Sequence, residues 1–384
     1  MNNNTKIVLL FILIRSLFMK VGLAKEIKKE EYRVGLTPLS AREYVDHGHS
    51  VLIEAGAGLG SGFTDEEYKA QGCQIFVDKK KLFDKADMIV KVKEPLECEY
   101  DLFHEDQVLY TYLHLAADLK QTRALLERKV KAVAYETVME KDGSLPLLIP
   151  MSQIAGRLAV QEGAKYLEKS YGGRGILLGG VPGIKKGNVL IIGGGISGTN
   201  ACKIAIGMGA DVTIMDISAK RLSEIDDIFG NSIKTMYSNS YNIDEMIRVA
   251  DLVIGAVLIP GAVAPKVIRG DDLKKMKKGS VIVDIAVDQG GCTETTRPTD
   301  HANPTYIIDG VVHYCVANMP GAVSLSSTYA LTSVTNRYGL MIADMGLEKA
   351  AEISGAILKG INCYKGKLTN KPVAEAHGLN YERY

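Results

Sequence analysis

The sequence predicts an α/β protein with two doubly wound domains, in which helices flank parallel sheets and a cleft lies between the domains. From Met19 onward, short apolar runs of strand length alternate with amphipathic stretches of helix length, which is typical of a parallel α/β sheet. The chain has 384 residues, of which 46% are hydrophobic and only 24% charged. This length and composition are sufficient for two separate hydrophobic cores.

The strand candidates form two sets with a helical stretch between them. Residues 151–173 carry apolar side chains at near-helical spacing, which predicts a long connecting helix that ends at Gly172–Gly173. The last sixty residues look helical and are expected to pack back across the domain boundary. The expected organisation is an N-terminal extension (1–18), a first domain (19–146 and 326–384) and a second domain (147–325). The strand candidates are 19–23, 50–54, 88–92 and 108–113, followed by 188–192, 211–215, 252–256, 280–285 and 311–316.

Charge and cysteine content exclude several classes of protein. There are 46 basic and 45 acidic side chains, without the basic excess that nucleic-acid binding requires. The six cysteines never occur in C-x-x-C spacing, and a chain of this length needs no disulfide framework. We therefore expect reduced thiols in a cytosolic protein, with no metal site. Cys292 follows two glycines and is a candidate reactive thiol, although a buried, inert cysteine is the favoured interpretation.

The stretch "KIVLLFILIRSLF" (6–18) resembles the apolar region of a signal peptide. Arg15 interrupts it, no small-x-small cleavage site follows, and it is too short to span a bilayer. We therefore expect either that Met19 is the functional start or that the extension is a disordered leader, and we expect no membrane partner.

The run "VLIIGGGISGTN" (189–200) raises the question of a phosphate site. Gly193, Gly195 and Gly198 follow the strand-like "NVLII" and precede the helical "SGTNACKIAIGMGA", and "DVTIMD" then ends in Asp216, eighteen residues after Gly198. In a βαβ unit this arrangement places a helix N-terminus on a pyrophosphate and a carboxylate on the adenosine ribose. The alternative is a simple glycine turn before a helix. The context favours a Rossmann-like dinucleotide site.

The same motif bears on the choice of cofactor. The carboxylate of Asp216 would repel a 2′-phosphate, so NAD is preferred over NADP. Arg221 weakens this preference, because it lies nearby and could swing toward such a phosphate.

Polar residues are also expected at the ends of other strands, where ligands of open α/β sheets bind. "VIVDIAVDQGG" predicts a strand that ends at Asp288, and "HYCVANMPG" predicts one that ends at Asn318 and Met319. Asp288 is therefore a candidate for chemistry. The alternative is a turn or helix-capping aspartate.

The first half of the chain lacks a phosphate fingerprint but carries Arg33, Lys93 and His114 near its predicted strand ends. A guanidinium suits a carboxylate, an ammonium polarises a carbonyl or imine, and an imidazole shuttles protons near neutral pH. Together these groups indicate a site for a small oxo or amino acid. Taken singly, Arg33 and Lys93 are equally consistent with solvated charges, and His114 with a core histidine that has a backbone partner.

From Met19 to its end the chain resembles the alanine dehydrogenases. The resemblance lies in "KEIKKEEYRVGLTP", "KVKEP", "YLHLAA", "YETV", "PLLIPMSQIAGRLA", "GGVPG", "VADLVIGAVLIPGAVAPK", "VDIAVDQGGC", "RPTDH" and "YCVANMPGAV". It implies that Arg33 and Lys93 bind substrate, that His114 and Asp288 are the catalytic pair, and that the protein is a homohexamer. It also implies that NAD is held by Ser152, Gly193, Gly195, Ile196, Ser197, Gly198, Asp216, Arg221, Ser238, Val257, Leu258, Ile285, Arg297, Val316, Asn318 and Met319.

The expected function is the reversible, NAD-dependent oxidative deamination of L-alanine to pyruvate and ammonium, in L-alanine catabolism. Arg33 would clamp the carboxylate, Lys93 would polarise the carbonyl, His114 would act as general acid and base, and Asp288 would orient water and ammonia. The domains are expected to close about the 140s and 320s.

Two other functions remain open at this stage. One is the NAD-binding α-subunit of a proton-translocating transhydrogenase, which has a similar two-domain plan but serves a membrane partner. The joint presence of Arg33, Lys93, His114 and Asp288 argues against it. The other is a non-catalytic NAD-binding or structural protein, in which those four residues would be incidental surface charges.

Overall fold

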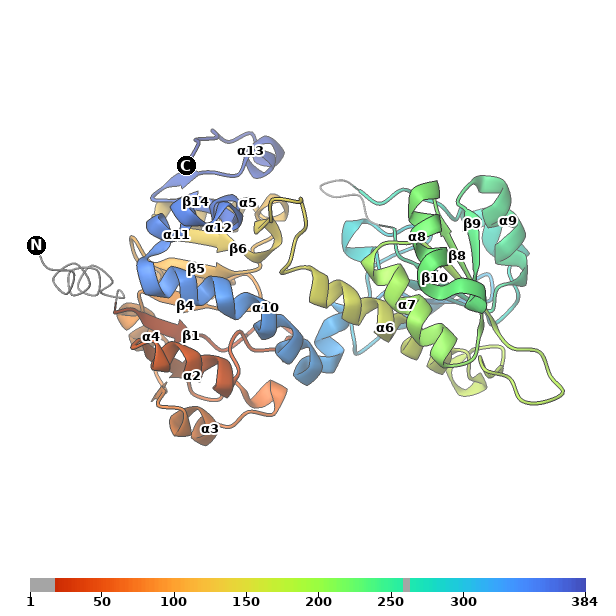
Figure 1. Cartoon of the computed structure of the whole chain (residues 1–384), viewed down its shortest axis with the longest axis horizontal. Helices are drawn as coiled ribbons and strands as arrows, with labels where there is room; N and C mark the ends of the chain where they lie inside the picture. The colour runs from red at the N-terminus through yellow and green to blue at the C-terminus, as the bar shows by residue number, and fades with distance from the viewer. Residues whose placement is uncertain (1–17, 258–262) are drawn as a thin grey trace, which may run out of the picture. The chain divides into compact units, whose positions relative to one another are not determined.

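The computed structural model describes residues 18–257 and 263–384, which fall into two compact units (Figure 1). The first unit contains the chain up to Pro150 together with Val323–Tyr384, and the second contains Met151–Ala322. Residues 1–17, which hold almost all of the apolar leader, and Leu258 lie outside the described ranges. The second unit is thus one continuous stretch of chain, whereas the first is assembled from two.

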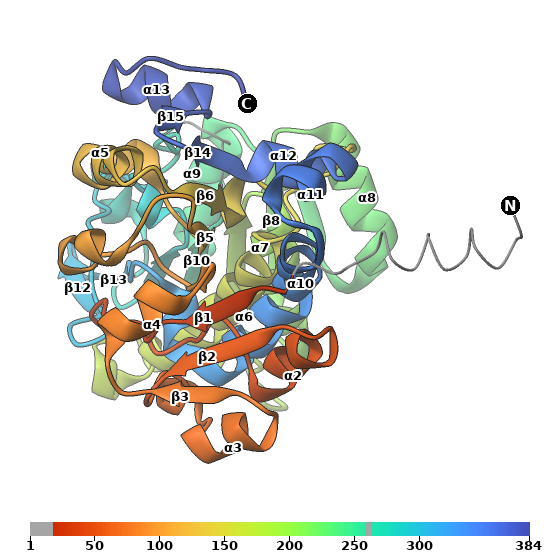
Figure 2. The same cartoon turned by 90° about the vertical axis from the view of Figure 1, so that its left-hand side faces the viewer.

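Eight strands form one sheet in the described part of the first unit, in the order β15-β14-β6-β5-β4-β1-β2-β3. Strands β1 to β6 pair in parallel, whereas β14 and β15 are antiparallel additions at one edge. Figure 2 shows β1, β2 and β3 side by side. The bounds are β1 Lys20–Leu23, β2 Ser50–Glu54, β3 Gln74–Phe76, β4 Met88–Val90, β5 Val108–Thr111, β6 Lys131–Ala134, β14 Ile361–Tyr364 and β15 Lys367–Leu368.

Helices cover both faces of this sheet. On one face, Leu82 and Phe83 of α4 pack in the same core as Leu109 of β5. On the other face, the hydroxyl of Tyr110 donates to the carbonyl of Thr335 in α10 at 2.9 Å. Successive residues of β5 therefore face opposite layers, as strand geometry requires. The helices are α2 Pro38–Asp46, α3 Asp65–Ala70, α4 Lys79–Lys85, α5 Leu119–Glu127, α10 Ser324–Met345, α11 Leu347–Ile353, α12 Gly355–Gly360 and α13 Lys371–His377.

Short polar side chains fix where several of these helices begin. Thr64 accepts from the backbone N–H of Glu67, whose carboxylate accepts from the N–H of Thr64, so α3 starts with a capping box. Asp78 caps α4 and Asp118 caps α5 more simply, each by accepting from the N–H three residues later. The local sequence therefore sets the point at which each loop after a strand turns into a helix.

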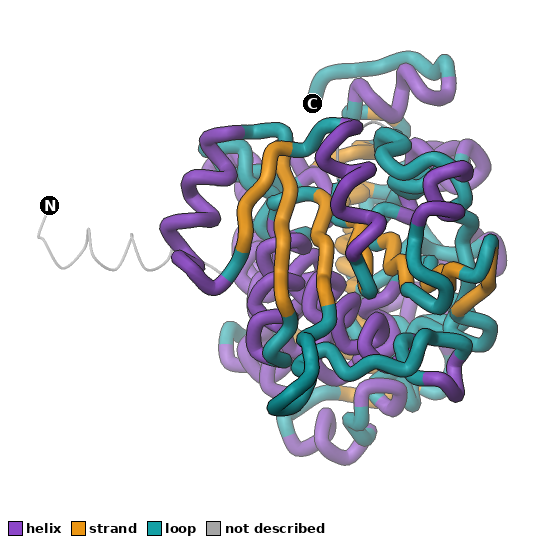
Figure 3. The backbone as a smooth tube through the Cα atoms, turned by 90° about the vertical axis from the view of Figure 1, so that its right-hand side faces the viewer, coloured by secondary structure: helices purple, strands orange, loops and turns teal. Residues whose placement is uncertain are grey.

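Seven strands form the sheet of the second unit among the described residues, in the order β12-β13-β11-β10-β7-β8-β9, and only β12 is antiparallel. Figure 3 shows these strands in orange with purple helices around them. Ile243 and Ile247 of α9 pack on one face of this sheet with Leu190 and Val253. The strands are β7 Asn188–Ile192, β8 Asp211–Asp216, β9 Lys234–Tyr237, β10 Leu252–Gly255, β11 Val281–Asp284, β12 Thr305–Ile308 and β13 Val311–Tyr314, and the helices are α6 Ile149–Tyr166, α7 Ile196–Gly207, α8 Ala219–Phe229 and α9 Ser240–Val249.

The connecting helix α6 ends earlier than predicted, at Tyr166 rather than at Gly172–Gly173. The chain folds back on the helix end, where the N–H of Gly173 donates to the carbonyl of Glu168 and the N–H of Gly175 to that of Leu167. The carbonyl groups that the helix itself leaves free at its C-terminus accept from nearer N–H groups, those of Gly163 and Ala164 from Leu167 and that of Lys165 from Glu168. Gly173 is required because a Cβ there would overlap the backbone of Tyr166 and Leu167.

The fold class predicted from the sequence is confirmed: two units of mostly parallel strands flanked by helices. All nine predicted strands exist, within two residues at each end. The all-parallel expectation is wrong at the sheet edges, where β12, β14 and β15 run antiparallel. None of the described helices is long and apolar enough to cross a membrane.

Candidate active site

Each sheet contains one point at which the strand order reverses. In the first unit the chain builds β1, β2 and β3 toward one edge and then β4, β5 and β6 toward the other, so the reversal lies between β1 and β4. In the second unit it lies between β7 and β10 for the same reason. Loops that leave such neighbouring strands in opposite directions open a crevice for ligands. Arg33 follows β1, Lys93 follows β4, and the glycine run follows β7.

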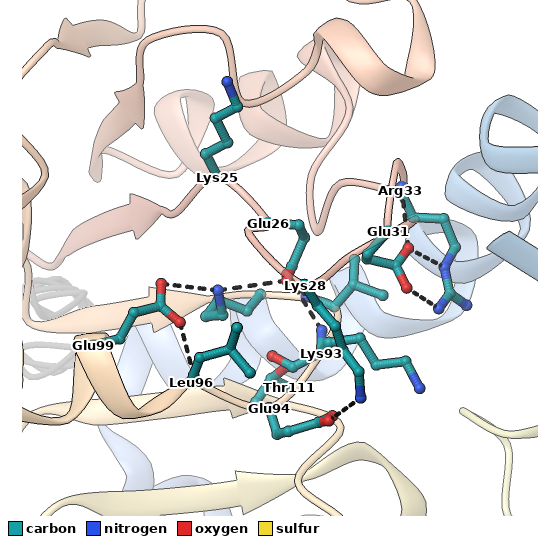
Figure 4. A network of polar contacts seen from close by, with 12 residues as sticks. Lys25, Glu26, Lys28, Glu31, Arg33, Lys93, Glu94, Leu96, Glu99 and Thr111 are labelled. Atoms are coloured by element: carbon teal, nitrogen blue, oxygen red, sulfur yellow. Dashed lines mark hydrogen bonds and ion pairs between the residues drawn. The ribbon is translucent and has the colours of Figure 1, made fainter. Parts of the chain in front are cut away.

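Arg33 is buried and held in a fixed orientation by Glu31. Its Nε donates to one carboxylate oxygen of Glu31 at 2.6 Å and its Nη2 to the other at 2.5 Å (Figure 4). Burial opposes both charges, but the hydrogen bonds and charge of the pair dominate, so the pKa of Arg33 is raised and that of Glu31 is lowered. Only 3% of Arg33 is exposed, so its interpretation as a solvated charge is wrong.

Lys93 lies below Arg33 in Figure 4. Burial lowers the pKa of its ammonium, and the positive charge of Arg33 lowers it further. The hydroxyl of Thr111 donates to the carbonyl of Lys93 at 3.1 Å, which fixes the backbone at this position. A partly desolvated ammonium next to a guanidinium favours the approach of a carboxylate or a carbonyl oxygen.

A buried ion network supports the backbone of Lys93. Glu26 accepts from the N–H groups of Val92 at 2.6 Å and Lys93 at 3.2 Å. Its other oxygen pairs with the buried ammonium of Lys91 at 3.4 Å, and Lys91 also pairs with Glu99 at 3.2 Å. Breaking a buried pair of this kind is costly. The network therefore fixes the backbone that follows β4 through hydrogen bonds at Val92 and Lys93.

The loop after β1 and the turn after β2 line a pocket of about 270 Å³. Arg33, Glu31 and Lys28 border it on one side, and Gly56 and Gly60 border it on the other. A molecule with few heavy atoms fits such a volume. Lys93 and His114 are not among the lining residues.

His114 follows β5 in a left-handed backbone conformation, with φ 51° and ψ 36°. Its imidazole is exposed, stacks on Tyr112 with 6.0 Å between ring centroids, and makes no hydrogen bond with the described residues. The alternative interpretation as a core histidine with a backbone partner is therefore wrong. The ring is available to a ligand.

Asp288 does not end a strand, contrary to the prediction. Strand β11 ends at Asp284, and Asp288 lies exposed in the 3₁₀ turn Val287–Gln289. Its carboxylate forms no hydrogen bond among the described residues, so it caps no helix in that part of the chain. The residue at the strand end, Asp284, is fully buried and accepts from the N–H groups of Ala286 at 3.0 Å and Cys292 at 2.8 Å. Asp284 thereby shapes the loop that presents Asp288.

The prediction that a strand ends at Asn318 and Met319 is also wrong. Strand β13 ends at Tyr314, Asn318 adopts a left-handed backbone with φ 62°, and Met319 is buried.

The glycine run has the close packing that a phosphate-binding turn requires. Gly193 has φ 105°, and a Cβ at Gly198 would overlap the carbonyl oxygen of Gly193. A Cβ at Gly195, by contrast, would meet nothing within 4 Å. Gly195 therefore opens space at the N-terminus of α7, where the backbone N–H groups and the helix dipole attract an anion. These residues fit a dinucleotide.

Asp216 and Arg221 brace this turn. One oxygen of Asp216 accepts from the N–H of Gly194 at 2.7 Å, and the other accepts from the N–H of Ser218 at 2.8 Å. Arg221 donates from Nε to the carbonyl of Gly194 at 2.7 Å and from Nη2 to Thr199 at 2.8 Å. Arg221 is therefore anchored to the turn rather than free to swing.

The remaining predicted cofactor residues lie in three places. Around the glycine turn, Ser197 donates to the carbonyl of Ser152 at 3.0 Å, Ile196 is exposed, and the N–H of Ser238 donates to the carbonyl of Asp216. Val257 and Ile285 follow β10 and β11. Apart from these, Val316 is buried. The Cζ of Arg297 lies 4.3 Å from the centre of the Tyr306 ring. Both residues line an open pocket of about 510 Å³ formed by residues from 297 to 306.

The thiols within the described residues are free, and only Cys98 is exposed. Burial, followed by the charge of Asp284, raises the pKa of Cys292 well above its usual range. A thiol in this state is a poor nucleophile. The expected burial of Cys292 is confirmed.

Three residues that support the site were not predicted: Glu31, Glu136 and Asp284. Glu31 lies only two positions before Arg33, in the loop after β1, so a pair of opposite charges this close was visible in the sequence. Glu136 accepts from the N–H groups of Leu113 and His114, as Asp284 does from those of Ala286 and Cys292, and no sequence signal identified either carboxylate.

Comparisons with known proteins identify relatives along nearly the whole chain. The family described as "Alanine dehydrogenase/PNT" matches with its N-terminal domain over residues 22–155 and with its C-terminal domain over residues 159–371. The chain is 56% identical over 364 residues to "Alanine dehydrogenase" of Methanococcus maripaludis, covering 94% of this chain and 98% of that protein. It is 55% identical over 365 residues to "Alanine dehydrogenase 2" of Staphylococcus aureus, covering 95% and 98% respectively.

Solved structures have the same fold. A structure of "L-alanine dehydrogenase" superposes with a TM-score of 0.92 at 50% identity and covers 94% of this chain and 99% of its own. A transhydrogenase from Sinorhizobium meliloti reaches a TM-score of 0.78 at 23% identity over 92% of this chain and 99% of its own, a likeness that shows the fold alone. The chain belongs to the alanine dehydrogenase/PNT family.

Proposed function

We propose that the protein oxidises L-alanine with NAD⁺ and water to pyruvate, ammonium and NADH, releasing one proton, and that it catalyses the reverse reaction. The observation that carries this proposal is the pairing of the buried, oriented Arg33 with Lys93 at the switch point of one sheet, in a chain whose relatives are named alanine dehydrogenases. The carboxylate of alanine or pyruvate suits the guanidinium of Arg33, and the carbonyl oxygen of pyruvate suits the ammonium of Lys93.

Arg33 and Lys93 hold the substrate in this proposal. Glu31 occupies one edge of the guanidinium of Arg33 and keeps its plane fixed, so the substrate carboxylate approaches an oriented donor. Lys93 supplies a second positive group, which attracts the carbonyl oxygen of pyruvate and polarises its C–O bond. Burial, followed by the charge of Arg33, lowers the pKa of Lys93.

His114 and Asp288 carry the proton traffic. The exposed imidazole of His114 takes a proton from the water that attacks the substrate imine, and returns one to nitrogen as ammonia leaves. Asp288 orients that water and the departing ammonia, since its exposed carboxylate forms no hydrogen bond among the described residues. The protonated imine and one water molecule thereby give pyruvate and one ammonium ion.

The cofactor of this family is a nicotinamide nucleotide, and we infer that this chain uses NAD rather than NADP. When bound, the nicotinamide accepts the hydride from the substrate Cα. Asp216 keeps a carboxylate at the end of β8, where an adenosine ribose would lie, and a 2′-phosphate there meets a negative charge. Arg221 does not offset this repulsion, because its donors engage Gly194, Thr199 and Glu224.

We further propose a cytoplasmic homohexamer that acts in L-alanine catabolism and binds neither membranes nor nucleic acid. Support comes from the balance of 46 basic against 45 acidic residues, the free thiols, and the resemblance to the alanine dehydrogenases. Light scattering of the purified protein measures its subunit number. A protein that begins at Met19 should assemble and act as the full chain does, and recovery of a secreted form cleaved after the apolar run would overturn the assignment.

The decisive experiment is to measure NADH formation by the purified protein with L-alanine and NAD⁺, and its consumption with pyruvate and ammonium. We expect both reactions, with D-alanine as the inactive control. The alternative function, as a transhydrogenase subunit, predicts instead hydride exchange between two nicotinamide nucleotides without any amino acid. Absence of alanine-dependent turnover would reject the proposed function.

A further inference from the structure

A carboxylate from the neighbouring strand end accepts from two successive backbone N–H groups, those of Leu113 and His114. Glu136 lies in the 3₁₀ turn Tyr135–Thr137, directly after β6, which pairs with β5. Its Oε1 accepts from the N–H of His114 at 2.6 Å and from the N–H of Leu113 at 3.1 Å. Its Oε2 also lies 3.2 Å from the N–H of Leu113.

The backbone at this position needs such support. His114 has φ 51°, a left-handed conformation that costs a non-glycine residue energy and persists only when its surroundings enforce it. The carbonyl of Leu113 accepts from Gln121 at 3.0 Å, and the carbonyl of His114 accepts from the N–H of Ala117 at 3.0 Å. All four backbone polar groups of the two residues are therefore occupied.

The imidazole itself is treated differently. It makes no hydrogen bond to any described residue, and the ring of Tyr112 stacks on it, nearly parallel at 12°. The hydroxyl of Tyr112 donates to the carbonyl of Leu147 at 2.6 Å, so this ring is fixed too. The hydrogen bonds therefore fix the backbone of His114, whereas both nitrogens of its ring remain open to a ligand.

We propose that Glu136 is a positioning residue, which holds the left-handed turn that aims the imidazole of His114 at the substrate. The inference rests on the proposed function, since it assigns Glu136 no contact with substrate and an effect only through His114. Position rather than charge is what Glu136 supplies: Oε1 alone accepts both N–H groups, so an amide oxygen in the same place keeps both hydrogen bonds and loses only the longer contact of Oε2 with the N–H of Leu113.

The test compares three substitutions at one position. Glu136→Gln retains an acceptor at the same distance along the side chain, and kcat should stay within about threefold. Glu136→Asp retains the charge but withdraws the acceptor by one methylene, and Glu136→Ala removes it. Both should lower kcat by about 10-fold or more while the KM for alanine changes less than threefold, because Arg33 and Lys93 are untouched. If Glu136→Asp were more active than Glu136→Gln, the charge rather than the position of the acceptor would matter, and the proposal would be overturned.

A double mutant separates this role from a general loss of stability. If Glu136 acts only through His114, then His114→Ala combined with Glu136→Ala is no slower than His114→Ala alone. The matched control is Asp118→Ala, which removes the cap of α5 in the same loop and should cost stability without lowering kcat. Additive losses of kcat in the double mutant would reject the proposal.

The outcomes also distinguish this inference from the proposed function. A wild-type protein without alanine oxidation, or a fully active His114→Ala variant, rejects the role of His114 itself. An inactive His114→Ala variant beside a fully active Glu136→Ala variant rejects the positioning role alone. If Glu136→Ala does not fold, the ranking of the Gln and Asp variants still decides the matter.

Discussion

The carboxylate of Asp216 accepts a hydrogen bond of 2.7 Å from the backbone N–H of Gly194. The residue proposed to select the cofactor thus also fixes the turn that would hold its phosphates. Asp216→Ala should therefore weaken NADH binding by about 1–3 kcal/mol, the scale of a lost charge-assisted hydrogen bond. The ratio of the affinity for NADH to that for NADPH should fall. Titration with each nucleotide, with the exposed Asp226→Asn as control, measures the change. Unchanged affinity for both nucleotides would remove Asp216 from the site.

Three glycines around α7 should respond differently to the same substitution. Gly198→Ala forces a Cβ onto the carbonyl of Gly193 and should destabilise the turn, whereas Gly207→Ala meets open space and should be silent. Gly195→Ala also meets open space, with φ −68°, so the fold should tolerate it. The new methyl group would nevertheless occupy space proposed for the pyrophosphate. A normal melting temperature with at least tenfold weaker nucleotide binding is the expected signature, and normal binding would place the pyrophosphate elsewhere.

Lys93→Met should abolish alanine oxidation and raise the melting temperature at neutral pH. The reason is that burial and Arg33 both disfavour the charge on Lys93 and lower its pKa. Because the pKa is lower in the folded state than in the unfolded state, the wild type gains stability as the pH rises between the two values. The advantage of the variant should therefore be largest below the lowered pKa and shrink above it. Thermal unfolding across this pH range tests the sign, and an advantage that grows with pH would contradict it.

His114→Ala should lower kcat by about 10²–10⁴, the usual contribution of a positioned proton-transfer group. The melting temperature should change by no more than a few degrees, because the exposed ring makes no hydrogen bond to the described residues. His114→Asn provides a control for the backbone, since asparagine tolerates the left-handed conformation well. Should the variants melt early yet turn over normally, His114 would be a structural residue.

Two aspartates four residues apart should behave in opposite ways. Asp288→Asn should lower kcat about 10²-fold or more without loss of stability, because its carboxylate is exposed and unpaired among the described residues. Asp284→Asn should cost about 1–3 kcal/mol of stability, because an amide cannot accept from Ala286, Cys292 and Thr296 together. Parallel unfolding and kinetic measurements on both variants test the pair. A fully active Asp288→Asn protein would exclude Asp288 from the chemistry.

The sequence predicted most of the inner strands and missed β6, β14 and all four edge strands, and the edge strands were missed for a physical reason. Inner strands such as β10, with all four residues buried, are continuous apolar runs. By contrast, β9 reads Lys-Thr-Met-Tyr and has no fully buried residue, so its pairing with β8 leaves no hydrophobic signal. The strands missed were β3, β6, β9, β12, β14 and β15.

The site shows the same division. The glycine spacing and Asp216 were readable because a phosphate turn constrains residues close in sequence. Asp288 was assigned to the wrong position relative to its strand, because "VDIAVD" contains two aspartates and periodicity does not say which one ends the strand. The bond from Glu136 to the N–H of His114 joins residues 22 apart and depends on the parallel pairing of β5 with β6. Such a contact follows only from the tertiary fold.

The first unit is built from two chain segments, and this division affects the order in which the two units can fold during translation. When the ribosome has made the chain up to Pro150, β6 is still an open sheet edge, because its partner β14 comes more than two hundred residues later. Helix α10 is also missing, although Gly339 must meet the ring of Tyr110 and the hydroxyl of Tyr44. An unpaired edge and bare aromatic surface are sites of aggregation in a nascent chain. The second unit is continuous in sequence and can fold first. The C-terminal segment then completes the sheet and the core of the first unit.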